Sequence, residues 1–384
     1  MSDEAVNELS AAYVNLTQYE VEALDSVLNL ADGHARQDLT PSQLEIVQSL
    51  PDMWIQSIGG KLSEIERDSA LQFFDVFGQY SHPAPGTELL ACYSSSVAME
   101  IFARSLSAEG LLSIGLLHPT FDNIPDILRG VGATLFPVEE DDLHSRGCID
   151  PDVLARVDAI FLTTPNNPTG QVIDAPMLAA IARQCAAAEV ILTLDTCFRG
   201  FDARAQYDHY AVLRESGCRW VVIEDTGKLW PTLELKIGWL AWSKNVGIPV
   251  ERIYSDILLG ISPVVMKMVQ QFARDAKEGG LHALHAGMRE NRNILRNTLH
   301  DLVGVDFPDP DNRGSVERIR FSHLESIRVW EVLRDRNVHV LPCQKFHWHR
   351  PDDGNDTVRV ALARPAHKVR QTAEALREVI LELG

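Results

Sequence analysis

Four short segments of this 384-residue chain carry side chains that could do chemistry. In chain order they are residues 164–170 (TPNNPTG), 194–200 (LDTCFRG), 224–228 (EDTGK) and 358–362 (VRVAL). Lys228 follows a short apolar run that predicts a buried strand, so a plain surface lysine fits this position poorly. An amine placed there can form a Schiff base with a carbonyl compound and can carry protons.

Two of the other segments hold a charged residue that has an ordinary alternative use. Asp195 ends the predicted strand 190–194, where it could pair with a cationic group or simply cap a following helix. Arg359 could bind a carboxylate through two parallel hydrogen bonds, or it could be a surface arginine on an edge strand.

Taken together, the four segments resemble the motifs of the fold-type-I aminotransferases, in the same order and at the usual spacings. This resemblance implies pyridoxal 5'-phosphate (PLP) as the cofactor, held by Lys228 as a Schiff base. Lys228 would then act as the catalytic base on the substrate Cα proton. Asp195 would keep the pyridine nitrogen protonated, and Arg359 would bind the substrate α-carboxylate.

Further positions match cofactor contacts of the family. Asn167 would donate a hydrogen bond to the phenolic oxygen of PLP and also approach the substrate. Phe121 would stack on the pyridine ring, although alone it would be interpreted as core. A run of serines precedes the predicted helix 97–106, and a helix N-terminus can hold a phosphate. The expected phosphate ligands are Ser94, Ser95, Ser96 and Lys236.

Two residues depart from the usual aminotransferase pattern. Asp225 stands three residues before the lysine, where many of these enzymes place a Ser or Thr on the phosphate. Because a carboxylate and a phosphate repel each other, we expect Asp225 to point elsewhere, toward a cationic substrate group or into a local salt bridge. Phe198 stands where many relatives have a Tyr, and it lacks the hydroxyl that would contact the phenolic oxygen.

These departures resemble a narrower group, the PLP-dependent L-arginine oxidases or 4-hydroxylases associated with enduracididine and antibiotic biosynthesis. The strings that carry this resemblance are residues 15–20 (NLTQYE), 31–36 (ADGHAR), 92–96 (CYSSS), 118–123 (HPTFDN), 223–231 (IEDTGKLWP) and 254–260 (YSDILLG). The resemblance implies oxidation of L-arginine by O2 without a metal or flavin. The products would be 4-hydroxy-2-ketoarginine, some 2-ketoarginine, ammonia and H2O2.

The same resemblance assigns arginine-binding roles to the N-terminal segment. Thr17 and Glu20 would approach the guanidinium, with Asp225 as a further partner, because a planar guanidinium pairs well with carboxylates. Asp32 and His34 would lie near the reacting side chain, and His34 would handle water or oxygen species. Without the resemblance, a capping box from Thr17 to Glu20 and a structural histidine would be the favoured interpretations.

The elements that must position these residues follow from the hydrophobic pattern. Short apolar runs predict buried strands at residues 111–117, 159–163, 190–194, 220–223 and 239–242. Helical periods lie between most of them, as at residues 177–188, which favours an α/β architecture. The family implies a large domain with a mostly parallel, seven-stranded sheet. A small α+β C-terminal domain follows, with predicted strands at 316–321, 338–341 and 357–363 and helices at 325–336 and the C-terminus. We expect an N-terminal lid segment (1–40, with one or two short helices), a large domain (41–305) and a small domain (306–384).

The bulk composition narrows the function classes. A net charge of −19 argues against nucleic-acid binding, which needs a basic face. The six cysteines show no metal-ligand spacing, so we expect no metal site. A polar, acidic N-terminus and the absence of a long apolar run predict a cytoplasmic enzyme without membrane segments. The family also implies a homodimer.

Two alternatives to an arginine oxidase remain open. A conventional aminotransferase acting on a cationic amino acid would share the four motifs. A binding or regulatory protein that reuses the fold is the least favoured, because Lys228 and Asp195 are intact and the N-terminal segment offers no basic DNA-binding domain.

Overall fold

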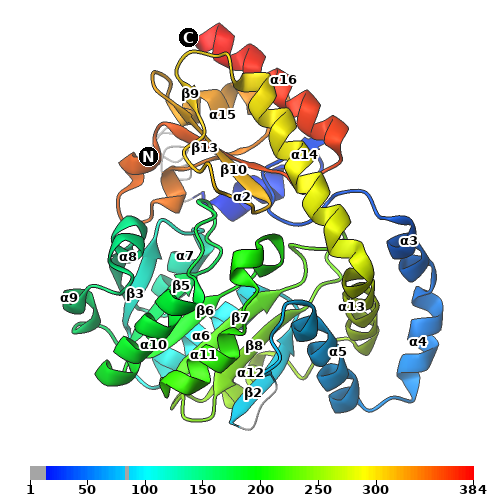
Figure 1. The fold of residues 1–384 in the computed structure, drawn as a ribbon, viewed down its shortest axis with the longest axis vertical. Helices are drawn as coiled ribbons and strands as arrows, with labels where there is room; N and C mark the ends of the chain where they lie inside the picture. The colour runs from blue at the N-terminus through cyan, green and yellow to red at the C-terminus, as the bar shows by residue number, and fades with distance from the viewer. Residues whose placement is uncertain (1–13, 83–85) are drawn as a thin grey trace, which may run out of the picture.

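Seven strands form one large sheet in the order β2-β8-β7-β6-β5-β3-β4 (Figure 1). The computed structural model describes residues 14–82 and 86–384. The strands are β2 (Thr87–Cys92), β3 (Ser113–His118), β4 (Thr134–Glu139), β5 (Ala159–Thr163), β6 (Ile191–Asp195), β7 (Trp220–Asp225) and β8 (Gly238–Ser243). Strand β8 is antiparallel to both neighbours and every other pair in this sheet is parallel, which confirms the expected mostly parallel sheet.

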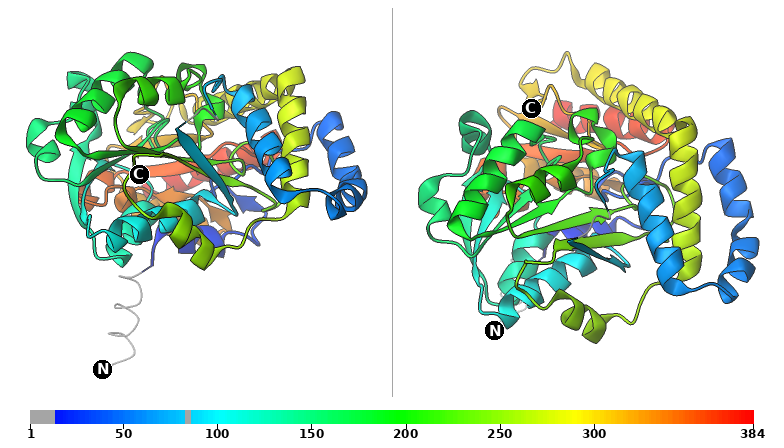
Figure 2. Two further views of the ribbon diagram at one scale, coloured as in Figure 1. Left: turned by 90° about the horizontal axis from the view of Figure 1, so that it is seen from below. Right: turned by 60° about the horizontal axis from the view of Figure 1, so that its bottom comes forward.

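Helices cover both faces of the large sheet because its strands are apolar on both sides. Along β5, Phe161 packs into the cluster on one face and Leu162 into the cluster on the other. The first face is covered by α6 (Ser95–Ala108), α7 (Asn123–Gly130) and α12 (Val250–Ile257). The second is covered by α10 (Ala175–Ala188) and α11 (His209–Ser216), with α5 (Leu62–Val76) and α13 (Pro263–Asp275) packed in the same cluster. Figure 2 shows the sheet edge-on between these layers.

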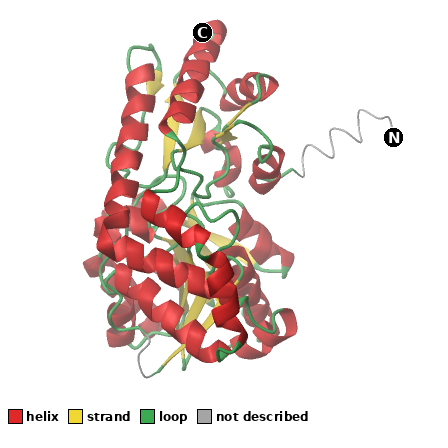
Figure 3. Cartoon of the chain, turned by 90° about the vertical axis from the view of Figure 1, so that its right-hand side faces the viewer, coloured by secondary structure: helices red, strands yellow, loops and turns green. Residues whose placement is uncertain are grey.

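A second, antiparallel sheet lies in the C-terminal part of the chain, in the order β12-β13-β10-β9. Its strands are β9 (Val305–Asp306), β10 (Val316–Phe321), β12 (Leu341–Pro342) and β13 (Thr357–Ala361). Three helices accompany it: α14 (Leu281–Leu299), α15 (Ser326–Asp335) and α16 (Ala366–Leu383). Figure 3 shows this sheet above the large one, with helices on the outside of both.

The single strand expected at 338–341 is wrong in detail. The structure divides it into β11 (Val338–His339), which pairs in parallel with β1 (Leu28–Asn29), and β12, which pairs with β13. The chain changes partner at Val340, so one apolar run serves two sheets. The remaining short elements are α3 (Pro41–Gln48), α4 (Leu50–Ile58), α8 (Glu140–Arg146), α9 (Pro151–Leu154) and the single turns η1 (Arg199–Phe201), η2 (Ala203–Ala205), η3 (Ala276–Gly280), η4 (Gln344–Phe346) and η5 (Pro351–Gly354).

The N-terminal segment crosses from the small sheet to the large one. It contains α2 (Leu16–Glu22); the part of the expected helical pattern before residue 14 lies outside the described residues. The Ala361 N–H donates to the Leu30 carbonyl (2.8 Å), and the Ala35 N–H donates to the Gly227 carbonyl (3.0 Å). The segment is therefore tied both to the C-terminal sheet and to the loop that carries Lys228. Within the described ranges, no helix is long and apolar enough to cross a membrane.

Candidate active site

A cavity opens at the carboxyl ends of β5, β6 and β7, the edge where open α/β sheets bind ligands. Asp195 and Asp225 are the last residues of β6 and β7, so the sheet itself aims both carboxylates there. Most of the residues expected in the site line this cavity: Thr17, Glu20, His34, Ser94, Ser95, Ser96, Phe121, Asn167, Asp195, Phe198, Asp225, Lys228 and Lys236. Asp32 and Arg359 do not line it but lie directly behind residues that do.

Lys228 is buried in this cavity among carboxylates. Burial alone lowers the pKa of its amine, but the charges of Asp225, Glu20 and Asp32 outweigh burial and raise the pKa above its ordinary value. The Lys228 amine also lies 6.0 Å from the centroid of the Phe198 ring. Lys228 is therefore an ammonium ion, and neutralising one of the neighbouring carboxylates would lower its pKa and make its proton easier to lose.

Asp195 presents a buried acceptor to the cavity. Its Oδ1 accepts a hydrogen bond from the Cys197 N–H (3.0 Å). Burial raises the pKa of Asp195, while this hydrogen bond and the nearby Lys228 lower it in part. A carboxylate in such a place gains from a cationic partner, and a protonated pyridine nitrogen is one.

The N-terminus of α6 is bound by Asp225, contrary to the expectation that this carboxylate points away from it. Asp225 Oδ2 accepts from the N–H and the hydroxyl of Ser95, both at 2.9 Å. Burial raises the pKa of Asp225, but Lys228 and Lys236 more than offset this and lower it. A carboxylate is itself an anion and is stabilised at a helix N-terminus, which explains why Asp225 lies there.

Gly238, at the start of β8, lets the sheet approach this helix N-terminus. A Cβ on Gly238 would lie 2.3 Å from the carbonyl carbon of Ser94, so no other residue fits without moving the backbone. The Ser94 hydroxyl accepts from the Val97 N–H (3.2 Å) as the helix cap. The Ser96 hydroxyl accepts from the Asn123 amide (3.2 Å).

Asp32, His34 and Lys236 form a chain of contacts that ends in the cavity. Asp32 Oδ1 lies 2.6 Å from Nδ1 of His34, and Nε2 of His34 lies 2.7 Å from the Lys236 amine. An ammonium ion has no acceptor, so Nε2 must be the accepting nitrogen and Nδ1 carries the proton. His34 and Arg364 keep the pKa of Asp32 far below its usual range, although burial opposes them. Asp32 therefore fixes the tautomer of His34.

The turn at 164–170 is organised by a buried glutamate. Glu140 Oε1 accepts from the Asn166 amide (2.7 Å) and from the Thr169 hydroxyl (2.8 Å), and burial raises the pKa of Glu140 to about 7. Gly170 has a φ of +74°, and a Cβ there would collide with Asn312. This turn presents Asn167, whose Oδ1 is buried without a hydrogen-bond partner among the described residues.

Arg359 is fully buried and only partly satisfied. Its Nη2 donates to the Ala31 carbonyl and lies 3.4 Å from Glu20 Oε1. Its Nε and Nη1 have no partner within the described chain. These two donors lie on different edges of the guanidinium and do not form one fork, so the expected role of Arg359 in binding the substrate carboxylate stays a prediction.

Helix α2 starts earlier than a capping box from Thr17 to Glu20 would require. Its N-cap is Asn15, which exchanges hydrogen bonds with Gln18, so the capping-box interpretation of Thr17 and Glu20 is wrong. Their side chains are free to line the cavity. Burial raises the pKa of Glu20, against the opposing charges of Arg359 and Lys228.

Some cavity residues were not found from the sequence. They are Gly33, Met99, Thr120, Asn123, Ile124, Thr163 and Cys197. Thr163 could have been found, because it ends a predicted strand at the ligand-binding edge of the sheet. Asp122, which accepts a hydrogen bond from the Leu16 N–H (2.6 Å), and the buried Glu140 gave no local signal.

The residues present fit PLP. A buried lysine, a carboxylate in need of a cation and an asparagine whose Oδ1 has no partner among the described residues face one cavity beside a helix N-terminus. Lys236 would hold the phosphate with the serines. Asp225 makes this cradle more negative than a serine would, so the phosphate would share the Ser95 donors with a carboxylate.

Comparisons with known proteins identify aminotransferases as relatives of this chain. The family model described as aminotransferase class I and II matches residues 85–377. A probable N-succinyldiaminopimelate aminotransferase of Mycobacterium tuberculosis is 25% identical over 309 residues, which cover 74% of this chain and 75% of that protein.

Solved structures include a nearer relative. MppP, determined after soaking with the product 2-ketoarginine, is 52% identical and superposes with a TM-score of 0.90 over 92% of this chain and 99% of its own. Aspartate aminotransferase of Thermus thermophilus with maleate is 18% identical with a TM-score of 0.75 over 95% and 96% of the two chains, a likeness of fold alone. The expected resemblance is thus confirmed, both for the fold and for a relative whose product is a keto acid of arginine.

Proposed function

The chain belongs to the class I and II aminotransferase family and is a PLP-dependent enzyme, and we propose that it oxidises L-arginine with O2. One observation carries this proposal: the 52% identity, over 92% of the chain, to a protein whose product is 2-ketoarginine. The products proposed are 4-hydroxy-2-ketoarginine, a smaller share of 2-ketoarginine, ammonia and H2O2.

PLP, when bound, supplies a carbonyl for amines and an electron sink for negative charge at the substrate Cα. The Lys228 amine takes the Cα proton of the substrate. The neighbouring carboxylates raise the pKa of this amine and so control when it is unprotonated and able to act as a base. Asp195 gives the cofactor's ring nitrogen an anionic partner. Arg359, a buried guanidinium with donors that have no partner among the described residues, binds the substrate α-carboxylate.

The guanidinium of arginine meets the acidic side of the cavity. Glu20 and Asp225 both line it, and Thr17 adds a hydroxyl from the same helix as Glu20. In the described structure Glu20 lies against Arg359 (3.4 Å), so arginine would take over both partners at once: its carboxylate on Arg359 and its guanidinium on Glu20.

His34 is proposed to direct water to the substrate Cγ. Its Nε2 is an acceptor, and its orientation is held by Asp32. Forming 2-ketoarginine removes two electrons from arginine, which convert one O2 to H2O2, and water replaces the amino nitrogen. The 4-hydroxylated product requires the removal of two further electrons, which convert a second O2 to H2O2, and its Cγ oxygen comes from water.

The deciding experiment is aerobic turnover of L-arginine without a keto acid, followed by an oxygen electrode and a peroxide assay. Oxygen uptake with an equal amount of peroxide is expected, with one ammonia for each arginine consumed, and mass spectrometry in H2¹⁸O should show label at Cγ. Lys228→Ala should abolish uptake, and Lys244→Ala, an exposed lysine after β8, should preserve it.

A conventional aminotransferase acting on a cationic amino acid is the second candidate, favoured by the family match. It predicts no oxygen uptake with arginine alone and turnover restored by a keto acid. That outcome would overturn the oxidase proposal.

We further propose a cytoplasmic homodimer that serves biosynthesis of an enduracididine-type arginine derivative. Helix α4 offers apolar surface that a second copy could cover, since Trp54, Ile55 and Ile58 are 64%, 67% and 77% exposed. Light scattering of the purified holoenzyme measures the assembly, and a monomeric mass would contradict it.

A further inference from the structure

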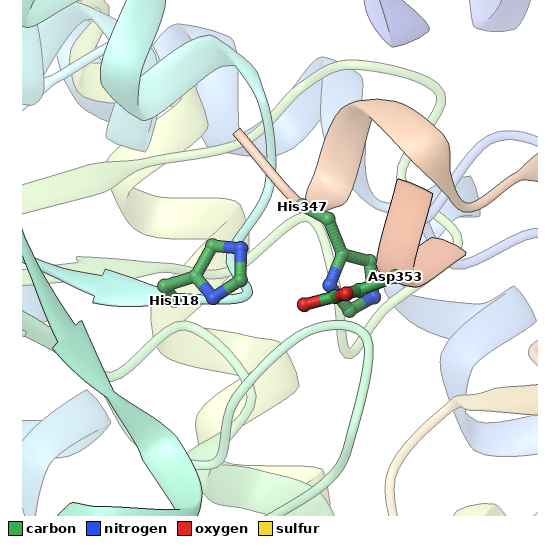
Figure 4. A group of neighbouring side chains, drawn as sticks. All are labelled: His118, His347 and Asp353. Atoms are coloured by element: carbon green, nitrogen blue, oxygen red, sulfur yellow. The ribbon is translucent and has the colours of Figure 1, made fainter. Parts of the chain in front are cut away.

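Two histidines and an aspartate meet outside the active-site cavity, where β3 contacts the segment 344–354. His118 is the last residue of β3, His347 follows η4 and Asp353 lies in η5. One ligand-type atom from each residue lies within 4.8 Å of those of the other two. Figure 4 shows the Asp353 carboxylate projecting between the two imidazole rings.

The imidazoles are buried and incompletely satisfied. His118 is 2% exposed and His347 is 8% exposed. Nε2 of His118 and both ring nitrogens of His347 have no hydrogen-bond partner among the residues that the structure describes. Buried polar atoms almost always have a partner, so two adjacent rings with three unpaired nitrogens point to a ligand between them.

Two carboxylates, those of Glu139 and Asp353, and the guanidinium of Arg350 surround the two rings. Nδ1 of His118 contacts Glu139 (3.1 Å), an arrangement that orients a metal-binding imidazole and leaves Nε2 free. Arg350 binds Glu139 and also donates to Asp353 Oδ2 (2.9 Å), so it holds both carboxylates in place. Burial lowers the pKa of His118, despite Glu139, and that of His347 to about 4.

We propose that His118, His347 and Asp353 bind one divalent transition-metal ion, with Zn²⁺ as the best match. Two imidazole nitrogens and one carboxylate oxygen are a donor set that Zn²⁺ takes, whereas Ca²⁺ and Mg²⁺ prefer oxygen ligands throughout. Ligands about 2.1 Å from a tetrahedral ion lie roughly 3.4 Å apart, so the three atoms, which lie within 4.8 Å of one another, must close by at most about 1.4 Å.

The ion would join the large sheet to the small domain beside the active site. The same segment already contacts β3 and the residues after it, since the Trp348 indole donates to the Leu117 carbonyl (2.8 Å) and the Thr120 N–H donates to the Phe346 carbonyl (3.0 Å). Phe121, which lines the cavity, is three residues beyond His118. The role is structural, and it is independent of the arginine chemistry.

No local pattern in the sequence indicates this site, and the sequence predicted no metal site. His118 and His347 are more than two hundred residues apart, so no ligand spacing exists to be recognised. Only the packing of η4 against β3 brings them together.

The test is Zn²⁺ binding by untagged, chelator-treated holoenzyme, measured by calorimetry, by metal content after gel filtration and by thermal unfolding. One equivalent of Zn²⁺ and a higher Tm with Zn²⁺ are expected. His347→Ala should weaken binding at least tenfold. His323→Ala, an exposed histidine after β10, should bind as the wild type does.

Asp353→Asn gives a second variant that avoids the core, because Asp353 is exposed. It should also weaken Zn²⁺ binding at least tenfold while the PLP absorption spectrum stays unchanged. Absence of stoichiometric binding by the wild type, or equal binding by the wild type and both variants, would overturn the site. Neither result depends on whether arginine is the substrate.

Discussion

Replacing Asp122 by Asn tests how α2 is held over the cavity. Asp122 Oδ2 accepts from the N–H of Leu16, the first residue of α2, and the carboxyl is buried. Burial raises its pKa from 3.8 to about 7, against the lowering effect of the Leu16 hydrogen bond. The negative charges of Asp126 and Glu20 add to the increase, and Lys345 opposes it.

The sign of the pH effect follows from this raised pKa. When α2 leaves the cavity, Asp122 meets water and titrates near its ordinary pKa. Between about pH 4 and pH 7 the docked state therefore binds more protons, so docking is strongest in acid and weakens as pH rises through this window. The difference between 3.8 and about 7 corresponds to about 4 kcal/mol, or roughly a thousandfold change in the docking equilibrium.

Hydrogen exchange followed by mass spectrometry measures this equilibrium. After correction for intrinsic exchange rates, protection of residues 14–23 in the wild type should fall between pH 5 and pH 8. Asp122→Asn keeps an acceptor for the Leu16 N–H but carries no charge, so its protection should fall much less. Asp152→Asn, at an exposed carboxylate on α9, should resemble the wild type. Equal pH dependence in the wild type and Asp122→Asn would refute the reasoning.

Four further predictions concern the cavity. His34→Ala should shift the product toward 2-ketoarginine while arginine oxidation continues, and an unchanged product ratio by mass spectrometry would remove His34 from the mechanism. Arg359→Lys should raise the KM for arginine about tenfold or more, because an ammonium ion cannot match the fork of a guanidinium; steady-state kinetics measure it. Glu20→Gln should cut the preference for arginine over an uncharged analogue by about tenfold, measured as the ratio of kcat/KM values. Asp225→Asn should lower the pKa of Lys228, since the charge of Asp225 raises it more than any other neighbouring charge does. Labelling of the amine in the PLP-free protein as a function of pH measures the change.

The sequence predicted the parts of the site that lie on regular elements. The predicted strand 190–194 corresponds to β6 (Ile191–Asp195), and the run 220–223 lies within β7, so Asp195 and Lys228 could be located from apolar runs alone. The motifs then supplied the chemical roles, which remain to be tested. The end of a strand depends on neighbouring residues, so a local apolar pattern is enough to predict it.

What the sequence missed depends on contacts between distant segments. Glu140 stands in the acidic run 139–142, which has the composition of an exposed helix start, yet its side chain is fully enclosed beneath the turn at 164–170. The sequence predicts repulsion between Asp225 and a phosphate, yet the Asp225 carboxylate itself accepts the hydrogen bonds of Ser95, 130 residues away. Neither of these contacts can be read from neighbouring residues.

The bridge made by the N-terminal segment has a consequence for folding. Arg364 donates to the Asn29 carbonyl across 335 residues of sequence and to the Asp32 carbonyl across 332. Contacts of such long range close only after nearly the whole chain is available, and they contribute to slow folding. The pocket around Lys228 therefore becomes complete late in synthesis, once the C-terminal strands have reached the first forty residues. A partly made chain that stops before Arg364 would have the lysine loop but not these contacts, so the site is finished only after Arg364 has been added.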